Sequence, residues 1–364
     1  MTQKVVVAIP HSHTWLWTQT AVAALAKYPP VADGWEAEII VVDNSEWSPA
    51  IRGVTDTRLG DGVTVVTNTK PEAFHGSALD FVVETIDFDY LMAMETDVCP
   101  TSPKWLEWFT GQMEPGVFGV GYWHYEQFLN PSCTLYDGEV LRAMSKWCRQ
   151  NRMDVMRWGD RFEKAECLDR RRFWKDYLPA EYVESIAGPF AEVRGWPEGT
   201  VLTERPSGQS KGPGWYEPGQ SLYHWAVEHG HRAQRCVAVT ANADGIPRGT
   251  FYGCEAPPPC DDWGAICASE AVAVHFWGGT RSLDMVKRDV TDETTRRYAE
   301  TWIRREAAIW RQVVPADLQA QAVDLMKRYG WHYRDWLTGG DVQPEQLAGV
   351  ETVLGIYRSA GVPI

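Results

Sequence analysis

The sequence predicts an α/β fold built on an open, mostly parallel β-sheet flanked by helices. Three observations predict it. Short runs rich in β-branched residues are typical of strands buried in a parallel sheet, segments with helical spacing separate several of them, and acidic residues end the second and fourth runs. Strands that alternate with helices form sheets of this class, and these sheets bind ligands at the carboxyl ends of their strands.

The predicted elements of this sheet follow one another along the first third of the chain. The strands are expected at residues 5–10 (VVVAIP), 38–43 (EIIVVD), 63–67 (VTVVT), 89–95 (DYLMAME) and 117–122. The helices between them are expected at residues 14–27, 72–86 and 103–112. Later elements are a helix at 222–229, short strands at 237–240 and 271–275, and an irregular insertion rich in cysteine and proline at 251–268.

The chain has 364 residues, which is enough for one large domain with an extension. We expect residues 1–290 to form the α/β domain that carries the site, with a mainly helical insertion at about 137–192. Residues 291–364 are expected to form a helical C-terminal region. The segment 203–219 is rich in Gly, Pro and Ser, and we interpret it as a lid, because long loops inside compact domains often close over a ligand.

Composition and charge limit the classes of function. The formal net charge is −14, so binding to nucleic acid would need a local basic patch such as Arg170, Arg171 and Arg172. An acidic balance also suits a protein that places carboxylates around a divalent cation. The chain has 19 tryptophans, which favour packing in the core and, for a few of them, stacking on sugar rings.

No membrane or targeting segment is expected. No apolar run reaches the roughly 18 residues that a transmembrane helix needs, and the N-terminal apolar run is interpreted as a strand and not as a signal peptide. The eight cysteines form no CxxC pair, and the cluster of Cys254, Cys260 and Cys267 lacks an obvious fourth zinc ligand. Reduced thiols and a cytoplasmic location are therefore the expectation.

The most informative local pattern is Glu95-Thr96-Asp97, directly after the fourth predicted strand. Two acids two positions apart at a strand end can direct oxygen atoms at one cation. Mg²⁺ or Mn²⁺ prefers such ligands and also binds a diphosphate. The alternative is an acid that caps the helix that follows.

The ends of the first two predicted strands carry further candidates. Asp43 and Asn44 follow the second strand, where an acid can accept hydrogen bonds from a ribose or a base, although a turn or cap would also use these residues. Pro10 and His11 stand where a glycine-rich loop would follow the first strand. A dinucleotide-binding fold and a P-loop are therefore disfavoured.

Two late segments supply the remaining candidates. His275 ends a predicted buried strand, where neutral imidazole is a good ligand for a borderline metal, and Arg281 could reach a phosphate. Glu217 follows Trp215 and Tyr216 and precedes a predicted helix, where a carboxylate could act as a general base. The alternatives are structural: a packed histidine, and an acid that complements the helix dipole.

Taken in order, these segments resemble the family-2 glycosyltransferases of the GT-A fold. VVVAIP is similar to the family's opening strand, EIIVVDNS to its nucleotide-binding strand, ETD to its metal-binding acid-x-acid motif, and VHFWGGTR to the segment with its late histidine. Residues 67–84 resemble the family's diphosphate-side helix, and residues 215–232 resemble the segment that carries its catalytic base. The family usually has a Glu-Asp pair at the base, whereas this chain has Glu217 followed by Pro218.

The resemblance implies a GT-A-like fold with a helical C-terminal extension, and a metal-dependent glycosyltransferase that inverts the anomeric carbon. It implies a nucleoside-diphosphate sugar as donor, Mn²⁺ or Mg²⁺ as cofactor, and an acceptor hydroxyl on a glycan, a protein or another molecule; a modified DNA base is disfavoured by the acidic charge. The residues that it implies are Asp97, His275 and Glu95 for the metal, Pro10, His11, Asp43, Asn44, Gly76, Asp80, Glu95, Thr96 and Arg281 for the nucleotide sugar, and Glu217 for the base.

Two other functions stay open. A nucleotidyltransferase would use a similar sheet and metal, but it would normally show a basic, glycine-rich loop after the first strand. A non-catalytic sugar- or nucleotide-binding protein of the same fold is favoured by the altered base motif.

Overall fold

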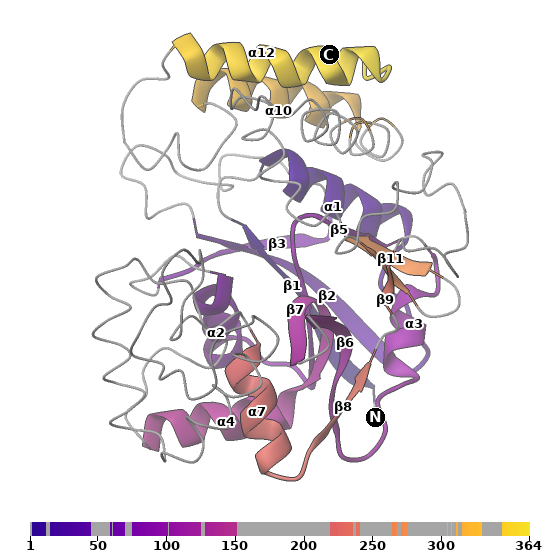
Figure 1. The fold of residues 1–364 in the computed structure, drawn as a ribbon, viewed down its shortest axis with the longest axis vertical. Coiled ribbons are helices and arrows are strands. Elements are labelled where there is room, and N and C mark those ends of the chain that lie inside the picture. The colour runs from indigo at the N-terminus through magenta and orange to yellow at the C-terminus, as the bar shows by residue number, and fades with distance from the viewer. Residues whose placement is uncertain are drawn as a thin grey trace, which may run out of the picture.

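The computed structural model has an α/β architecture around a seven-stranded sheet (Figure 1). The residues that it describes are 2–11, 15–44, 59, 61–69, 75–100, 102–124, 128–150, 219–235, 238–240, 264–267, 271–275, 304, 307, 311, 315–329 and 344–364. The strands of the sheet are, in spatial order, β3 (Val63–Thr67), β2 (Trp35–Asp43), β1 (Gln3–His11), β4 (Tyr90–Met94), β7 (Phe128–Asp137), β6 (Val117–His124) and β8 (Arg232–Arg235).

The sheet is mostly parallel, as the sequence predicts. Strands β3, β2, β1 and β4 run in the same direction, and β8 is parallel to β6. Only β7 is antiparallel to its neighbours, β4 and β6, within this sheet. The α/β fold class is therefore confirmed.

Helices cover both faces of the sheet (Figure 1). On one face lie α2 (His75–Thr85), α4 (Gly138–Gln150) and α7 (Gln220–Glu228), and on the other lie α1 (Trp15–Lys27) and α3 (Trp105–Thr110). Successive side chains of a strand point to opposite faces, so β1 supplies Val6 to the first core and Val7 to the second. Strands buried on both faces are continuous apolar runs, and this is why the sequence predicts them.

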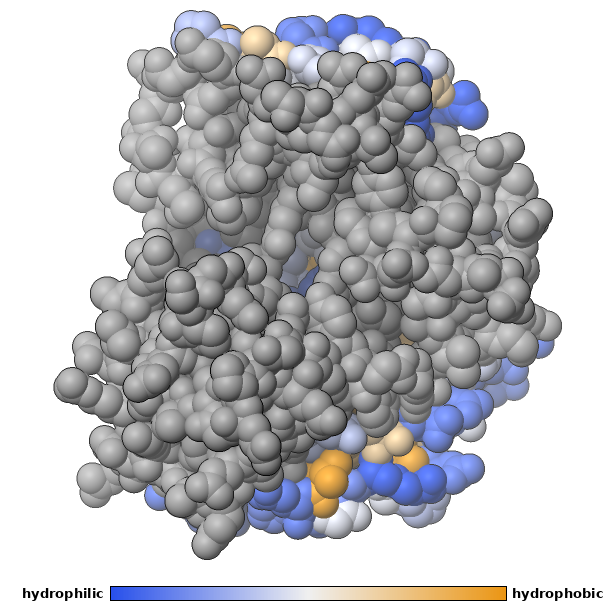
Figure 2. Space-filling model, in the orientation of Figure 1, coloured by the Kyte–Doolittle hydropathy of each residue, from blue (hydrophilic) through white to orange (hydrophobic). Residues whose placement is uncertain are grey.

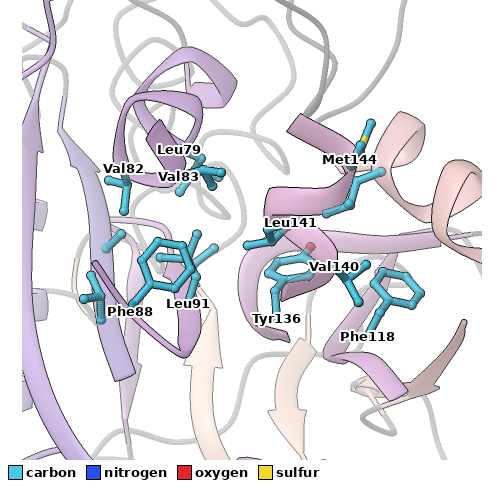
Figure 3. Packing of buried hydrophobic residues seen from close by; sticks show 14 of the residues in the cluster. Leu79, Val82, Val83, Phe88, Leu91, Phe118, Tyr136, Val140, Leu141 and Met144 are labelled. Carbon is cyan, nitrogen blue, oxygen red and sulfur yellow. The ribbon is translucent and has the colours of Figure 1, made fainter. Parts of the chain in front are cut away.

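The apolar core between α2 and the sheet contains residues of β1, β2 and β4 and also of β6 and β7. In Figure 3, Leu79 and Val82 of α2 lie over Phe88 and Leu91, while α4 packs against Tyr136. All the labelled side chains in this view are buried. The cluster holds α2 rigidly against the strands whose carboxyl ends carry the candidate acids.

Strand β7 was not predicted. Its segment contains Asn130, Pro131 and Ser132, which depress strand propensity. Pairing overrides this propensity, because β4 pairs with residues 133–137 only, so Pro131 lies outside that stretch. At the C-terminal end of β7, Asp137 Oδ1 accepts hydrogen bonds from the backbone N–H groups of Glu139 and Val140, at 2.8 and 3.1 Å. Asp137 thereby caps α4.

A second, four-stranded sheet adjoins the first. Its strands, in spatial order, are β5 (Val98–Pro100), β11 (Ala271–His275), β10 (Gly264–Cys267) and β9 (Ala238–Thr240). The predicted strand at residues 271–275 is confirmed. The prediction of an irregular insertion is wrong for β10, because antiparallel pairing with β9 and β11 gives this short segment backbone partners on both sides.

Helices end the chain, as the sequence predicts. Helices α10 (Ala316–Tyr329) and α12 (Pro344–Ser359) form a third apolar cluster, which includes Ala23 of α1 (Figure 1). The predicted domain limits stay a prediction. Within the residues that the structure describes, no helix has the length and apolar character needed to cross a bilayer.

The described surface is mainly polar. On the face drawn in Figure 2, most of the coloured atoms belong to hydrophilic residues. The large apolar side chains exposed in the described part of the chain are Val31, Val227 and Leu347, which belong to three separate segments. Single exposed apolar residues of this kind are normal and mark no docking surface.

Candidate active site

The order of the strands singles out the point between β1 and β4. From β1 the chain adds β2 and then β3 on one side, and β4 on the other. In open α/β sheets, ligands bind outside the carboxyl ends of the strands at such a switch point. The residues that follow β1 and β4 are therefore the first candidates for a site.

Strands β1, β2 and β3 end level with one another. His11, the last residue of β1, pairs in register with Asp43, and Asp43 pairs with Thr67. His11 and Asp43 are both fully buried. The His11 ring is held from α1, because its Nδ1 lies 2.6 Å from Thr18 Oγ1. Pro10, one residue earlier on β1, shares this edge.

A buried polar network continues this edge beyond the strands. The backbone N–H of Asn44 donates to His11 O and that of Asn68 donates to Asp43 O, both at 2.9 Å. Asn68 Nδ2 donates to Asn44 Oδ1 at 2.8 Å and to Ser77 Oγ at 3.2 Å. The network therefore fixes the ends of β2 and β3 to the first turn of α2. Hydrogen bonds inside a protein are stronger than in water, so such a network is rigid.

The acids after β4 lie in a tight turn. The turn is closed by a hydrogen bond of 3.1 Å from the N–H of Val98 to Glu95 O. It is tied to β7 by a second bond of 2.8 Å, from the N–H of Glu95 to Ser132 O. Asp97 is 5% exposed and Thr96 is 6% exposed, whereas the Glu95 side chain is 30% exposed. The two carboxylates thus stand on one rigid turn that joins the large sheet to the small one.

The alternative interpretation, in which one of these acids caps the helix that follows, is wrong. They do not cap the next helix, because the turn leads into β5, and α3 begins only at Trp105. Lys104 is the N-cap residue of α3, and no side-chain hydrogen bond caps that helix. Glu95 and Asp97 are therefore placed by the strand end and not by the helix.

His75 and Cys133 are ionisable residues that lie near Glu95. His75 Nδ1, at the start of α2, lies 3.3 Å from Glu95 Oε1. Burial, and then the negative charge of Glu95, raise the pKa of the Cys133 thiol far above its usual range. The Cys133 thiol therefore loses its proton less readily than an exposed thiol does.

The small sheet brings the late histidine to the acid turn. His275, the last residue of β11, pairs in register with Val98, the residue that follows Asp97. The two residues are about 175 positions apart in the chain and adjacent in the sheet. The register places the backbone of His275 beside the turn, and its side chain lies outside the described atoms.

Helix α2 begins at the same edge. Two contacts of its first turn hold it there, from Ser77 to Asn68 and from His75 to Glu95. The N-terminus of a helix favours negatively charged groups, including phosphates. Gly76 and Asp80 lie on this helix and are buried, and their predicted contact with a diphosphate stays a prediction.

The helix that follows the predicted base begins at a constrained glycine. Gly219 has φ 91° and precedes α7. A Cβ atom at this position would collide with Leu129 O and would lie 2.9 Å from Pro131 Cδ. The entry to α7 is thereby fixed against β7, two residues after Glu217.

We expect Gly219→Ala to destabilise the protein more than Gly230→Ala, which is the matched control. Gly230 also has a positive φ, 83°, but a Cβ there would meet nothing within 4 Å. Both changes carry the backbone cost of about 1–2 kcal/mol. Gly219→Ala adds roughly 1–3 kcal/mol from overpacking. Urea unfolding of the two variants measures the difference, and equal losses of stability would contradict the described entry to α7.

Some predicted site residues lie outside the described part of the chain. They are Glu217, Arg281, the lid segment up to residue 218, the basic run at 170–172, and Cys254 and Cys260. Within the described residues, no group of three or more His, Cys, Asp and Glu side chains is gathered to hold a metal ion. The described part of the predicted metal site is therefore its two acids.

Three residues of this edge were not singled out in the sequence: His75, Asn68 and Ser77. Asn68 directly follows the predicted strand at 63–67, so the same strand-end rule that selected Asp43 would have found it. His75 and Ser77 come from the first turn of α2, and the expected start of that helix, at residue 72, was too early to mark them.

Comparisons with known proteins give distant structural likenesses only. No protein-family model and no curated protein matches the sequence. Glucosyl-3-phosphoglycerate synthase from Mycobacterium tuberculosis, in complex with phosphoglyceric acid, is 16% identical with a TM-score of 0.29, over 38% of this chain and 58% of that chain. The same synthase with Mn²⁺, uridine-diphosphate and glucosyl-3-phosphoglycerate gives 13% and 0.31, over 54% and 82%.

Mannosyl-3-phosphoglycerate synthase from Rubrobacter xylanophilus is also similar, with 18% identity and a TM-score of 0.25, over 38% of this chain and 55% of that chain. These synthases are GT-A-type glycosyltransferases, the class that the sequence resembles. The chain spans 58% of the first of these structures. Because the overlaps are partial and the identities low, the function rests on the chain's own residues.

Proposed function

We propose that this protein transfers a sugar from a nucleoside-diphosphate donor to an acceptor hydroxyl, with Mn²⁺ or Mg²⁺ as cofactor. One observation carries the proposal. The ends of β1, β2 and β4 meet at one edge of the sheet, with Asp43 on one side of the switch point and the Glu95-Thr96-Asp97 turn on the other. A nucleoside bound at Asp43 would extend its diphosphate toward the acids.

The acid turn suits a hard divalent cation in its chemistry. Glu95 and Asp97 offer carboxylate oxygens, the ligands that Mg²⁺ and Mn²⁺ prefer. Asp97 is nearly buried on a turn held at both ends, and the register of β11 supports His275 as a third ligand. A cation held there would neutralise the charge that develops on the diphosphate leaving group.

The nucleotide sugar would be held by the remaining residues of this edge. Asp43 accepts hydrogen bonds from the nucleoside, with Pro10, His11 and Asn44 around it. Gly76, in the first turn of α2, and Asp80, further along the same helix, would contact the diphosphate together with Thr96 and Arg281. The buried hydrogen bond between Asn44 and Asn68 holds this edge of the sheet in place before the donor binds. Such preorganisation lowers the entropic cost of donor binding.

Glu217 is the proposed general base. It takes the proton of the acceptor hydroxyl while the acceptor oxygen attacks the anomeric carbon in line with the departing diphosphate. A new C–O bond forms, the bond to the diphosphate breaks, and the configuration at the anomeric carbon inverts. Two residues later, at Gly219, the described chain enters α7 in a constrained conformation.

Incubation with a set of labelled nucleotide sugars tests the proposal. We expect one donor to release a nucleoside diphosphate and a labelled product, or free sugar when water is the acceptor, and only when Mn²⁺ or Mg²⁺ is present. Binding of a donor with no release, across all donors and with both cations, would instead identify a non-catalytic binding protein. Release of pyrophosphate from a nucleoside triphosphate would identify a nucleotidyltransferase.

A further inference from the structure

His75 and Glu95 connect two separate elements at the edge of the sheet. His75 is the first residue of α2, and Glu95 is the first residue of the turn after β4. His75 Nδ1 lies 3.3 Å from Glu95 Oε1, and the two side chains are 22% and 30% exposed. The contact is therefore partly shielded from water, and a polar contact is stronger there than on an open surface.

The backbones on both sides of this contact are already fixed. The N–H of Glu95 donates to Ser132 O at 2.8 Å, and the first turn of α2 is held by the bond between Asn68 and Ser77. The side chain of Glu95 has several rotatable bonds, and a contact that orders it reduces its rotamer freedom. Because a carboxylate is planar, contact at Oε1 also fixes the direction of Oε2.

Among the described residues, the ring of His75 has no polar contact other than the one with Glu95. Its Nε2 atom is buried and has no hydrogen-bond partner in the described part of the chain. A histidine that served the core would normally have both nitrogens paired, because buried polar atoms are almost always hydrogen-bonded. The polar contact that explains the position of this ring is therefore the one with Glu95.

We propose that His75 is a positioning residue that orients the Glu95 carboxylate for the divalent cation. The inference rests on the proposed function, since it gives His75 a part in cation binding. Nδ1 carries the proton and donates it toward Oε1, which leaves Oε2 directed by the same contact. Groups that orient a metal ligand in this way typically affect metal affinity by about 10–100-fold when they are removed.

Titration of the 364-residue chain with Mn²⁺ alone, followed by the EPR signal of free Mn²⁺, tests this inference without any need for turnover. We expect His75→Leu to weaken Mn²⁺ binding by about 10–100-fold. His75→Asn should restore most of the affinity, because the Asn amide nitrogen occupies the place of Nδ1. His75→Gln, whose amide nitrogen lies nearer the place of Nε2, should not.

A double-mutant cycle with Glu95→Gln shows whether His75 acts through Glu95. In that background His75→Leu should cost little further affinity, whereas a general loss of structure would add to the effect of Glu95→Gln. Wild-type affinity in folded His75→Leu, or equal affinities of His75→Asn and His75→Gln, would overturn the inference while leaving the proposed function intact. If His75→Leu does not fold, the comparison of Asn with Gln decides. Failure of the wild-type protein to bind Mn²⁺ would remove the metal site itself.

Discussion

Replacement of Asp97 by Asn should lower glycosyl transfer by about a thousandfold or more. A bound cation supplies several kcal/mol of charge stabilisation to a leaving diphosphate, and each step of about 1.4 kcal/mol changes the rate tenfold. Asn keeps the shape of Asp97 but loses the charge that holds the cation. Nucleoside diphosphate and Mn²⁺ should also lose their mutual effect, because each is expected to tighten the binding of the other through this carboxylate. Initial rates and calorimetry with and without Mn²⁺ measure the two effects.

Asp87→Asn is the matched control for this variant. Asp87 is exposed and precedes the same strand, β4, at its opposite end. Its loss removes one negative charge from the protein but leaves the acid turn unchanged, so its rate and its metal dependence should stay near those of the wild-type protein. Tight binding of a nucleoside diphosphate to Asp97→Asn, with the wild-type dependence on Mn²⁺, would remove Asp97 from the metal site.

Glu217→Gln should lower transfer by about 10²–10⁴-fold while donor affinity survives. Gln keeps the shape of the side chain and cannot accept a proton, so the loss should appear in kcat and not in donor binding. The result would identify Glu217 as the group that activates the acceptor. Single-turnover rates with saturating donor, together with donor Kd values, separate the two quantities.

The control for Glu217→Gln lies at the other end of the helix that follows. Glu228 is exposed at the C-terminal end of α7, and Glu228→Gln changes the net charge by the same amount. This control should transfer sugar at a near-wild-type rate. If Glu217→Gln did so as well, Glu217 would be an acid that complements the dipole of α7, and Asp244 or Asp80 would be the next acids to test.

The parallel half of the sheet could be predicted because burial on both faces makes its strands continuous apolar runs. The strand at residues 63–67 was predicted with the bounds that the structure has, and β1 and β2 differ from prediction only at their ends. The polar ends of these strands could be predicted for the same reason: where an apolar run stops, Asp43 and the acid turn begin.

What could not be predicted depends on contacts between distant segments. Strand β7 is specified by pairing with β4 and β6 more than by its own residues, and β8 is four residues long and polar. His275 lies beside the residue that follows Asp97 because β11 pairs in this register with β5. No local pattern in the sequence encodes that register. The contact between His75 and Glu95 likewise needs the packing of α2 against the sheet.

The central claim is that one edge of the sheet binds a nucleoside diphosphate together with a divalent cation. Calorimetric titration of the wild-type protein with a panel of nucleoside diphosphates, with and without Mn²⁺, tests it most directly. We expect one nucleoside diphosphate to bind preferentially and Mn²⁺ to tighten it by about 5- to 150-fold. Absence of binding across the panel, or an affinity that Mn²⁺ leaves unchanged, would contradict the claim.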